Sequence, residues 1–310
     1  MPNLSNDARQ SAPISLACMR RLFARPARVN GSQFLRREIS GRMFERLALI
    51  RANPHMLLDA GCGEGDDLLA LHQTFPASAR LGVDASFAML DVARRRLAQS
   101  QSAMRRFLAD WFGQGRFGPD VALLACADFA SVPLSQSSVD LVWSNLALHW
   151  HPQPDRVFAE WRRILRADGL LMFSSFGPDT FRQLRHAFAA VGEDHVVLPF
   201  VDLHDLGDML VEAGFATPVM DMETLNITYS SVNKLLDDVR AFGGNPLLTR
   251  KTGLTGRKRW QAFSDALESQ RGPDGKLMLS IEIVYGHAFR PASRALASDE
   301  SIIQLNLRRD

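Results

Sequence analysis

Hydrophobic and polar residues follow one another in blocks that indicate alternating strands and helices. From Phe34 onward, apolar residues recur at helical spacing, which predicts an amphipathic helix ahead of the first strand. Short apolar runs with the length of buried strands lie at 55–61, 79–84, 120–128, 139–145 and 167–177. Helical patterns separate most of them, at 66–75, 87–99 and 157–165. This order predicts an α/β fold with an open, mostly parallel sheet and helices on both faces.

The C-terminal part of the chain departs from this simple alternation. We expect a helix that starts near Asp179, another at 203–215, and two late strands at 218–229 and 277–289 with a mainly helical segment between them. The stretch at 98–119 is longer than an ordinary connection and is interpreted as an insertion at the sheet edge. Residues 1–18 are polar and small without apolar periodicity, which predicts a disordered tail.

Composition narrows the class of protein further. With 46% hydrophobic residues in 310, the chain can bury a full core. No apolar run is long enough to cross a bilayer, and the N-terminus lacks the apolar region of a secretory signal, so we expect a cytoplasmic protein. The three cysteines have no metal-type spacing, which disfavours both a disulfide framework and a metal site.

The formal charge of +2 is unevenly distributed. Residues 1–51 contain ten arginines and only three acidic residues, and a second basic cluster runs from Arg250 to Trp260. The Arg-rich N-terminus also has the composition of an organelle transit peptide. These clusters could bind nucleic acid, a membrane surface or an acidic protein, or could simply be a solvated face.

The stretch "LLDAGCGEG" at 57–65 places three glycines directly after a predicted buried strand. Such a loop lets the backbone approach a ligand closely at the carboxyl edge of the sheet. A dinucleotide fingerprint would need a glycine in place of Asp66, and a phosphate-binding P-loop would need a Gly-Lys-Ser/Thr sequence. Asp66 and Asp67 would also compete with phosphate for the helix N-terminus. We therefore expect a ligand that is not strongly anionic, such as a nucleoside joined to an amino acid and a sulfonium. Asp59 would attract its cationic part and Asp84 would accept its ribose hydroxyls.

These segments resemble the class I S-adenosylmethionine-dependent methyltransferases, whose first motif matches "LLDAGCGEG" and whose second matches "GVDAS" at 82–86. The resemblance implies a Rossmann-like, seven-stranded sheet with a reversed last strand and S-adenosylmethionine as cofactor. It implies contacts of the glycine loop with the methionine part, of Asp84 with the ribose, and of the "ADF" segment at 127–129 with the adenine. The residues expected to bind the cofactor are Asp59, Gly61, Cys62, Gly63, Asp84, Ala85, Asp128, Phe129, Ser144 and Asn145.

The segment at 140–185, with "SNLALHW" and "FGPDTFRQLR", resembles more narrowly the malonyl-acyl-carrier-protein O-methyltransferases of biotin synthesis. Further matches lie at 200–215, 219–229 and 282–289, whereas Val29 and Asn30 stand where that family usually has a tyrosine. The resemblance implies one methyltransferase domain over 19–310, with N-terminal helices at 19–52, a cofactor-binding core at 53–176, and an acceptor side with a helical lid at 177–310.

The implied reaction is methyl transfer to the free carboxylate of malonyl-acyl carrier protein or malonyl-CoA. A carboxylate is already ionised at neutral pH and needs no general base. An acidic carrier protein would dock on the basic clusters, with no nucleic acid or membrane involved. His149 and Trp150 are expected in the wall of the acceptor pocket. Arg182 and Arg185, one turn apart, are candidates for binding the malonyl carboxylate. Tyr285 could line the same pocket.

Two other functions are compatible with the same motifs. A related group comprises assembly factors of respiratory complex I described as hydroxylating an arginine. The absent N-terminal tyrosine favours this group, whereas "NLALHW" at 145–150 and "YGHAF" at 285–289 favour the biotin enzymes. The other is a non-catalytic S-adenosylmethionine-binding partner protein. Methyl transfer to a malonyl carrier protein would distinguish the malonyl-acyl-carrier-protein O-methyltransferases from both of these alternatives.

Overall fold

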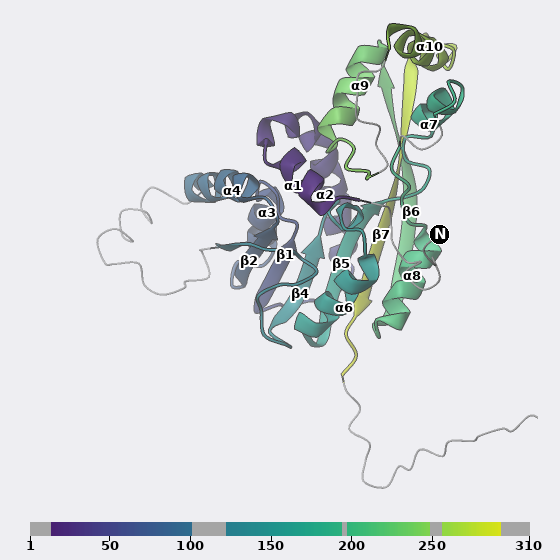
Figure 1. Ribbon diagram of the computed structural model, residues 1–310. Coiled ribbons are helices and arrows are strands. Elements are labelled where there is room, and N and C mark those ends of the chain that lie inside the picture. The colour runs from purple at the N-terminus through teal and green to yellow at the C-terminus, as the bar shows by residue number, and fades with distance from the viewer. Residues whose placement is uncertain (1–13, 101–121, 194–196, 249–255, 293–310) are drawn as a thin grey trace, which may run out of the picture.

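A computed structural model describes residues 14–100, 122–193, 197–248 and 256–292. Seven strands form one sheet in the order β3-β2-β1-β4-β5-β7-β6, in which β7 is antiparallel to both β5 and β6 (Figure 1). This arrangement confirms the predicted mostly parallel sheet with its reversed last strand. The strands are β1 Met56–Ala60, β2 Ala79–Asp84, β3 Ala122–Cys126, β4 Val139–Ser144, β5 Leu165–Phe176, β6 Ala216–Tyr229 and β7 Leu277–Phe289.

Helices cover both faces of the sheet because successive residues of its central strands point in opposite directions. Leu57 and Leu141 belong to the hydrophobic cluster on one face, whereas Leu58 and Val142 belong to the cluster on the other. All four side chains are at most 1% exposed. The helices that follow β1 are α3 Asp66–Thr74, α4 Phe87–Ser100, α6 Pro154–Ile164, α7 Arg182–Ala189, α8 Leu203–Glu212, α9 Val232–Ala241 and α10 Arg257–Glu268.

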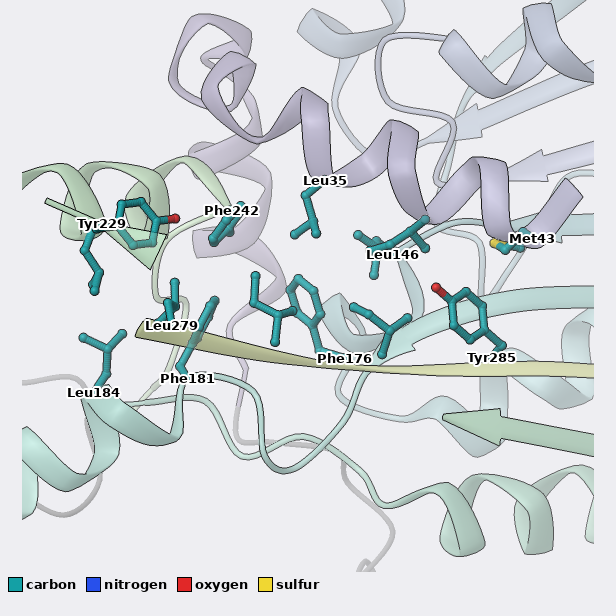
Figure 2. Packing of buried hydrophobic residues seen from close by; sticks show 14 of the residues in the cluster. Leu35, Met43, Leu146, Phe176, Phe181, Leu184, Tyr229, Phe242, Leu279 and Tyr285 are labelled. Atoms are coloured by element: carbon teal, nitrogen blue, oxygen red, sulfur yellow. The ribbon is translucent and has the colours of Figure 1, made fainter. Parts of the chain in front are cut away.

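Helix α2, Gln33–Leu47, lies across the first face and presents the predicted apolar stripe to it. Its four inward residues, Leu35, Ile39, Met43 and Leu47, are 2% exposed or less. They pack against strand residues of β4, β5 and β7, and Figure 2 shows Leu35 and Met43 directed from α2 toward β7. Burial of such side chains stabilises the fold by about 1.5–3 kcal/mol each. The stripe therefore fixes α2 above the edge of the sheet where β1 ends.

The opposite face is covered by α6 and α8. Helix α6 begins at Pro154, whose fixed φ suits the first helical turn, and buries Phe158 and Trp161 completely. Helix α8 begins after Asp202, whose side chain accepts the backbone N–H of His204. Both helices contribute to the second hydrophobic cluster. Neither helix supplies a residue to the cavity described below.

Regular structure begins closer to the N-terminus than the sequence predicted. Ile14 forms an isolated bridge with Leu247, and helix α1, Leu16–Phe23, begins after Ser15, whose hydroxyl accepts the N–H of Cys18. Met19 is 7% exposed. The prediction of a tail over 1–18 is therefore wrong for residues 14–18, because apolar contacts of α1 hold them. Residues 1–13 lie outside the described residues.

Two further expectations fall partly or wholly outside the described residues. Residues 98–100 of the expected insertion belong to the end of α4, and the remainder of it is not described. Of the basic cluster at 250–260, residues 256–260 are described, mostly as the start of α10. The helical segment predicted between the late strands contains α9 and α10. Among the described residues, no helix has the length and apolar character to span a membrane.

Candidate functional site

A cavity opens at the carboxyl ends of β1, β2 and β4, and the glycine loop between β1 and α3 forms its floor. Gly61 and Gly63 have φ values of +83° and +52°, in the left-handed region that favours glycine. The N–H of Gly61 donates to the carbonyl of Val83 at 2.8 Å, which folds the loop back over β2. A Cβ on Gly61 would lie 2.3 Å from the Cβ of Ala147, whereas one on Gly63 would meet open space. The loop is thus packed on one side and open to a ligand on the other.

Asp84, the last residue of β2, is fixed by the same loop. Its Oδ2 accepts the N–H of Gly63 at 3.0 Å and its Oδ1 accepts the N–H of Ser86 at 2.7 Å. Burial raises the pKa of Asp84 to about 6, opposed by these two backbone hydrogen bonds. Each oxygen keeps a lone pair for a further donor. The carboxylate can therefore accept two hydroxyl groups of a ligand.

Two more carboxylates, those of Asp59 and Asp67, line the same cavity. Asp59 is 1% exposed, and its Oδ2 has no hydrogen-bond partner among the described residues. Burial, together with Asp67 and Asp84, raises the pKa of Asp59 well above its usual range. Asp67 accepts hydrogen bonds from Ser40 at 2.6 Å and from the indole of Trp143 at 2.9 Å. An unpartnered buried acceptor beside two carboxylates is costly unless a cationic ligand group neutralises it.

Two arginines of α2, Arg36 and Arg37, also line the cavity. Arg36 donates to the carbonyl of Val29 at 3.1 Å, and its Nη2 lies 3.6 Å from Glu64 of the glycine loop. Glu64 also pairs with Arg96 of α4 at 2.9 Å. Burial lowers the pKa of Arg36, opposed chiefly by Glu64. The Nη2 of Arg36 has no hydrogen bond among the described residues, so it can still bind a ligand anion.

Apolar and aromatic side chains complete the cavity. Met19 and Phe23 come from α1, Ala85 and Met89 from the segment after β2, and Phe129 from the loop after β3. The loop after β4 contributes the three consecutive residues Asn145, Leu146 and Ala147, and also Trp150. A flat apolar ligand group fits the first set, and the second set faces the glycine loop through Ala147.

The structure brings most of the predicted cofactor residues together. Asp59, Gly61, Cys62, Gly63, Asp84, Ala85, Phe129 and Asn145 all line the cavity. Ser144 and Asp128 do not. The hydroxyl of Ser144 donates to the carbonyl of Ala60 at 2.8 Å and so joins β4 to β1. Asp128 accepts the N–H of Ala130 in a turn and lies 3.8 Å from Arg20. For these two residues the geometry shows structural contacts, and a cofactor contact stays a prediction.

The two arginines predicted to bind an acceptor carboxylate have different surroundings. Arg185 donates to the carbonyl of Thr180 at 2.7 Å and to that of Pro178, so its guanidinium holds the loop before α7. Arg182 has no side-chain partner among the described residues. Neither arginine lines the cavity. Arg185 is thus already occupied by backbone carbonyls and is not paired with Arg182 toward a ligand. Spacing along the sequence could not reveal these carbonyl contacts.

His149 and Tyr285 are both buried outside the cavity. His149 is 4% exposed, and its ring stacks on Phe176 with a centroid distance of 4.4 Å. Tyr285 lies under α2, where the guanidinium of Arg46 is 4.0 Å from its ring centroid (Figure 2). Burial and nearby Glu223 raise the pKa of Tyr285. The structure therefore places Tyr285 in the contact between α2 and the sheet.

Sequence reasoning missed the arginines that face the glycine loop. Arg36 and Arg37 line the cavity, yet the helical pattern marks only their neighbour Leu35 as inward-facing. The sequence did contain a signal for Arg36. It follows the stripe residue Leu35, and a residue next to a buried stripe lies at the edge of the buried helix face. The α1 residues Met19 and Phe23 were also missed as cavity residues, whereas Trp150, expected in the wall of the acceptor pocket, lines this cavity.

The fold and the cavity define a class I S-adenosylmethionine-dependent methyltransferase, and residues 58–173 match the family described as methyltransferase domain. The YcgJ protein from Bacillus subtilis has a similar fold, with a TM-score of 0.53 at 17% identity over 82% of this chain and 99% of that protein.

The similarity to curated relatives is more specific. The malonyl-[acyl-carrier protein] O-methyltransferase of Gallionella capsiferriformans is 40% identical, over 95% of this chain and 98% of that relative. The enzyme of the same name from Laribacter hongkongensis is 43% identical, over 84% of each chain. The chain belongs to the malonyl-[acyl-carrier protein] O-methyltransferase family.

Proposed function

We propose that this chain transfers the methyl group of S-adenosylmethionine to the free carboxylate of a malonyl group on acyl carrier protein, forming the methyl ester that starts biotin synthesis. The observation that carries the proposal is the extent of the similarity. The generic methyltransferase match ends at residue 173, whereas the Gallionella relative is matched over 98% of its length. That match therefore includes the acceptor side, where enzymes of one fold differ in substrate.

The cavity fits the cofactor by charge and shape. Asp84 would accept the ribose hydroxyls, and Ala85 and Phe129 would flank the adenine, as the positions after β2 and β3 allow. The backbone of Gly61, Cys62 and Gly63 would pass under the methionine part. The Oδ2 of Asp59, which has no hydrogen-bond partner among the described residues, suits its ammonium group. The Nη2 of Arg36 faces Glu64 at 3.6 Å without a hydrogen bond, and it suits the carboxylate.

The protein's main task in this reaction is to position the two reactants. S-adenosylmethionine supplies an activated methyl group on sulfur, and a malonyl carboxylate is an ionised nucleophile at neutral pH. No general base is required, so an in-line approach and the exclusion of water supply the rate enhancement. Asn145, Leu146 and Ala147 lie beside the glycine loop and are mostly buried. We assign them to the wall that separates the reacting groups from water.

The test is transfer to a defined acceptor. Purified chain, S-adenosylmethionine and malonyl-acyl carrier protein should give a carrier heavier by one methylene and sensitive to mild base, as measured by intact-protein mass spectrometry. Malonyl-CoA tests the need for the carrier, and the acetyl carrier, which has no free carboxylate, is the control. Cofactor binding without transfer would support the non-catalytic partner instead, and addition of oxygen to an arginine would support the hydroxylase.

The acidic carrier protein is proposed to dock on the N-terminal basic residues. Arg21 on α1, Arg25 just before the short turn at Pro26–Arg28, and Arg28 at the end of that turn are all exposed. The same helix supplies Met19 and Phe23 to the cavity, so a carrier bound there would lie beside the entrance. Opposite charges would steer the encounter. The cytoplasm is the proposed site of the reaction, which fits the unpaired state of all three cysteines.

A further inference from the structure

His149 lies in a short 3-10 turn, Leu148–Trp150, just after β4. Its ring is enclosed by aromatic side chains on three sides. It stacks on Phe176, lies 4.8 Å from the ring of Trp150, and meets the edge of Phe200 at 5.6 Å. Burial in these surroundings lowers the pKa of His149 to about 3, so the imidazole is neutral.

One hydrogen bond decides where the single ring proton of His149 resides. The backbone N–H of Phe176 donates to Nδ1 at 3.4 Å, so Nδ1 is the acceptor and Nε2 carries the hydrogen. This Nε2–H is buried and has no hydrogen-bond partner among the described residues. Buried donors without partners are rare in folded proteins, because they have lost hydration without compensation.

The ring of His149 lies between Trp150 of the cofactor cavity and a row of buried phenylalanine side chains. Trp150 lines the cavity and contacts the His149 ring, while on the other side Phe176 leads through Phe181 to Phe242 after α9. Figure 2 shows Phe176, Phe181 and Phe242 following one another between β7 and the helices above it. Phe176, Phe181 and Phe242 are buried in one hydrophobic cluster. An acyl chain that reaches the cofactor from the α9 side would have to part these side chains and would then meet the Nε2–H of His149.

The geometry points to His149 as a substrate-binding residue whose Nε2–H donates to the thioester carbonyl oxygen of the acyl acceptor. The thioester carbonyl suits this donor better than the carboxylate does. A carboxylate enclosed by aromatic rings without a cation would pay a large desolvation cost, whereas a neutral carbonyl needs one neutral donor. This inference rests on the proposed function, since it takes the acceptor to be a malonyl thioester.

The experiment compares His149→Phe with the wild type on two acceptors. One is malonyl-CoA, and the other is its thioether analogue, in which a methylene replaces the thioester carbonyl. With malonyl-CoA we expect kcat/KM to fall by about tenfold or more in H149F, because one hydrogen bond to the acceptor is lost. With the thioether, H149F and wild type should differ little. His149→Gln keeps an N–H donor and should restore part of the loss.

Two further measurements separate binding from packing. H149F should bind S-adenosylmethionine as the wild type does in calorimetry, and its Tm should rise, because an unpartnered buried donor is replaced by a ring of similar shape. Equal losses on both acceptors, or full activity of H149F, would overturn the role of His149 while leaving the proposed function intact. A wild-type chain inactive on both malonyl-CoA and malonyl-acyl carrier protein would overturn the proposed function and this inference together.

Discussion

Asp84 shows how burial sets the chemistry of a single residue. Its carboxylate is buried at the end of β2, and its pKa is raised from 3.8 to about 6. The folded chain therefore favours the protonated form. The corresponding contribution to stability is complete below pH 3.8 and is lost as the pH rises through about 6. Ligand binding has the opposite preference, because the ionised carboxylate accepts hydroxyl groups better.

The first prediction concerns the pH dependence of cofactor binding. The affinity for S-adenosylmethionine should be highest above pH 7 and fall as the pH is lowered through about 6, measured by calorimetry. Asp59, whose pKa is also raised, acts in the same direction. Asp84→Asn should weaken binding at pH 8 by about 10- to 100-fold, because one oxygen can no longer accept. Its remaining pH dependence should be shallower, and wild-type affinity in this variant would refute the ribose assignment.

At the scale of elements, the site depends on loops and helices that interlock. The glycine loop after β1 packs against the loop after β4, and α2 is joined to the start of α3 by the hydrogen bond from Ser40 to Asp67. Trp143 of β4 donates to the same Asp67. These contacts bring three elements, distant in sequence, to one edge of the sheet. The cavity is thus a product of packing between elements.

The second prediction tests the contact between the two loops. Gly61→Ala should destabilise the fold by about 1–3 kcal/mol, because a methyl group 2.3 Å from the Cβ of Ala147 forces the loops apart at a positive φ. Gly41→Ala is the matched control. Gly41 is an exposed position in α2 with free space around it, so alanine should stabilise the helix by about 0.5–1 kcal/mol. Urea unfolding measures both, and equal stabilities would refute the packing argument.

Two clusters of basic residues stand out in the sequence, and of their described residues only those of the N-terminal cluster line the cavity. Exposed arginines on α1 and the turn that follows it belong to the segment that lines the cavity. Arg257 and Lys258 lie at the start of α10, which Figure 1 shows at the other end of the sheet from α3 and α4. A formal charge of +2 conceals this difference. The position of the charges, and not their sum, decides where an acidic partner can deliver its acyl group.

The third prediction follows from that position. Arg25→Glu with Arg28→Glu should raise the KM for malonyl-acyl carrier protein by about five- to tenfold at low salt, because charge reversal repels an acidic carrier. Activity on malonyl-CoA should be much less affected. Added salt should reduce the difference in KM for malonyl-acyl carrier protein between this double variant and the wild type. Arg257→Glu with Lys258→Glu is the control with the same change in charge. A larger effect in this control would move the docking surface to α10.

The sequence alone determined the elements and the ligand class. Apolar periodicity is a local property, so the α2 stripe and the strand runs were readable from it, and the stripe residues Leu35 and Ile39 are buried as predicted. The glycine loop and Asp84 were also readable, because strand ends in a parallel sheet meet at one edge. Eight of the ten residues predicted to bind the cofactor line the cavity.

Tertiary structure decided what the remaining polar side chains do. Arg185 and Ser144 looked available in the sequence, but backbone carbonyls brought close by the fold occupy them. The sequence pattern gave no role to Arg36, but the fold brings this residue of α2 to the glycine loop and the cavity. Hydrogen-bond partners come from segments far apart in the chain, and spacing along the sequence carries no record of them. For the same reason, only the fold shows that the buried Nε2 of His149 has no hydrogen-bond partner within the described part of the chain.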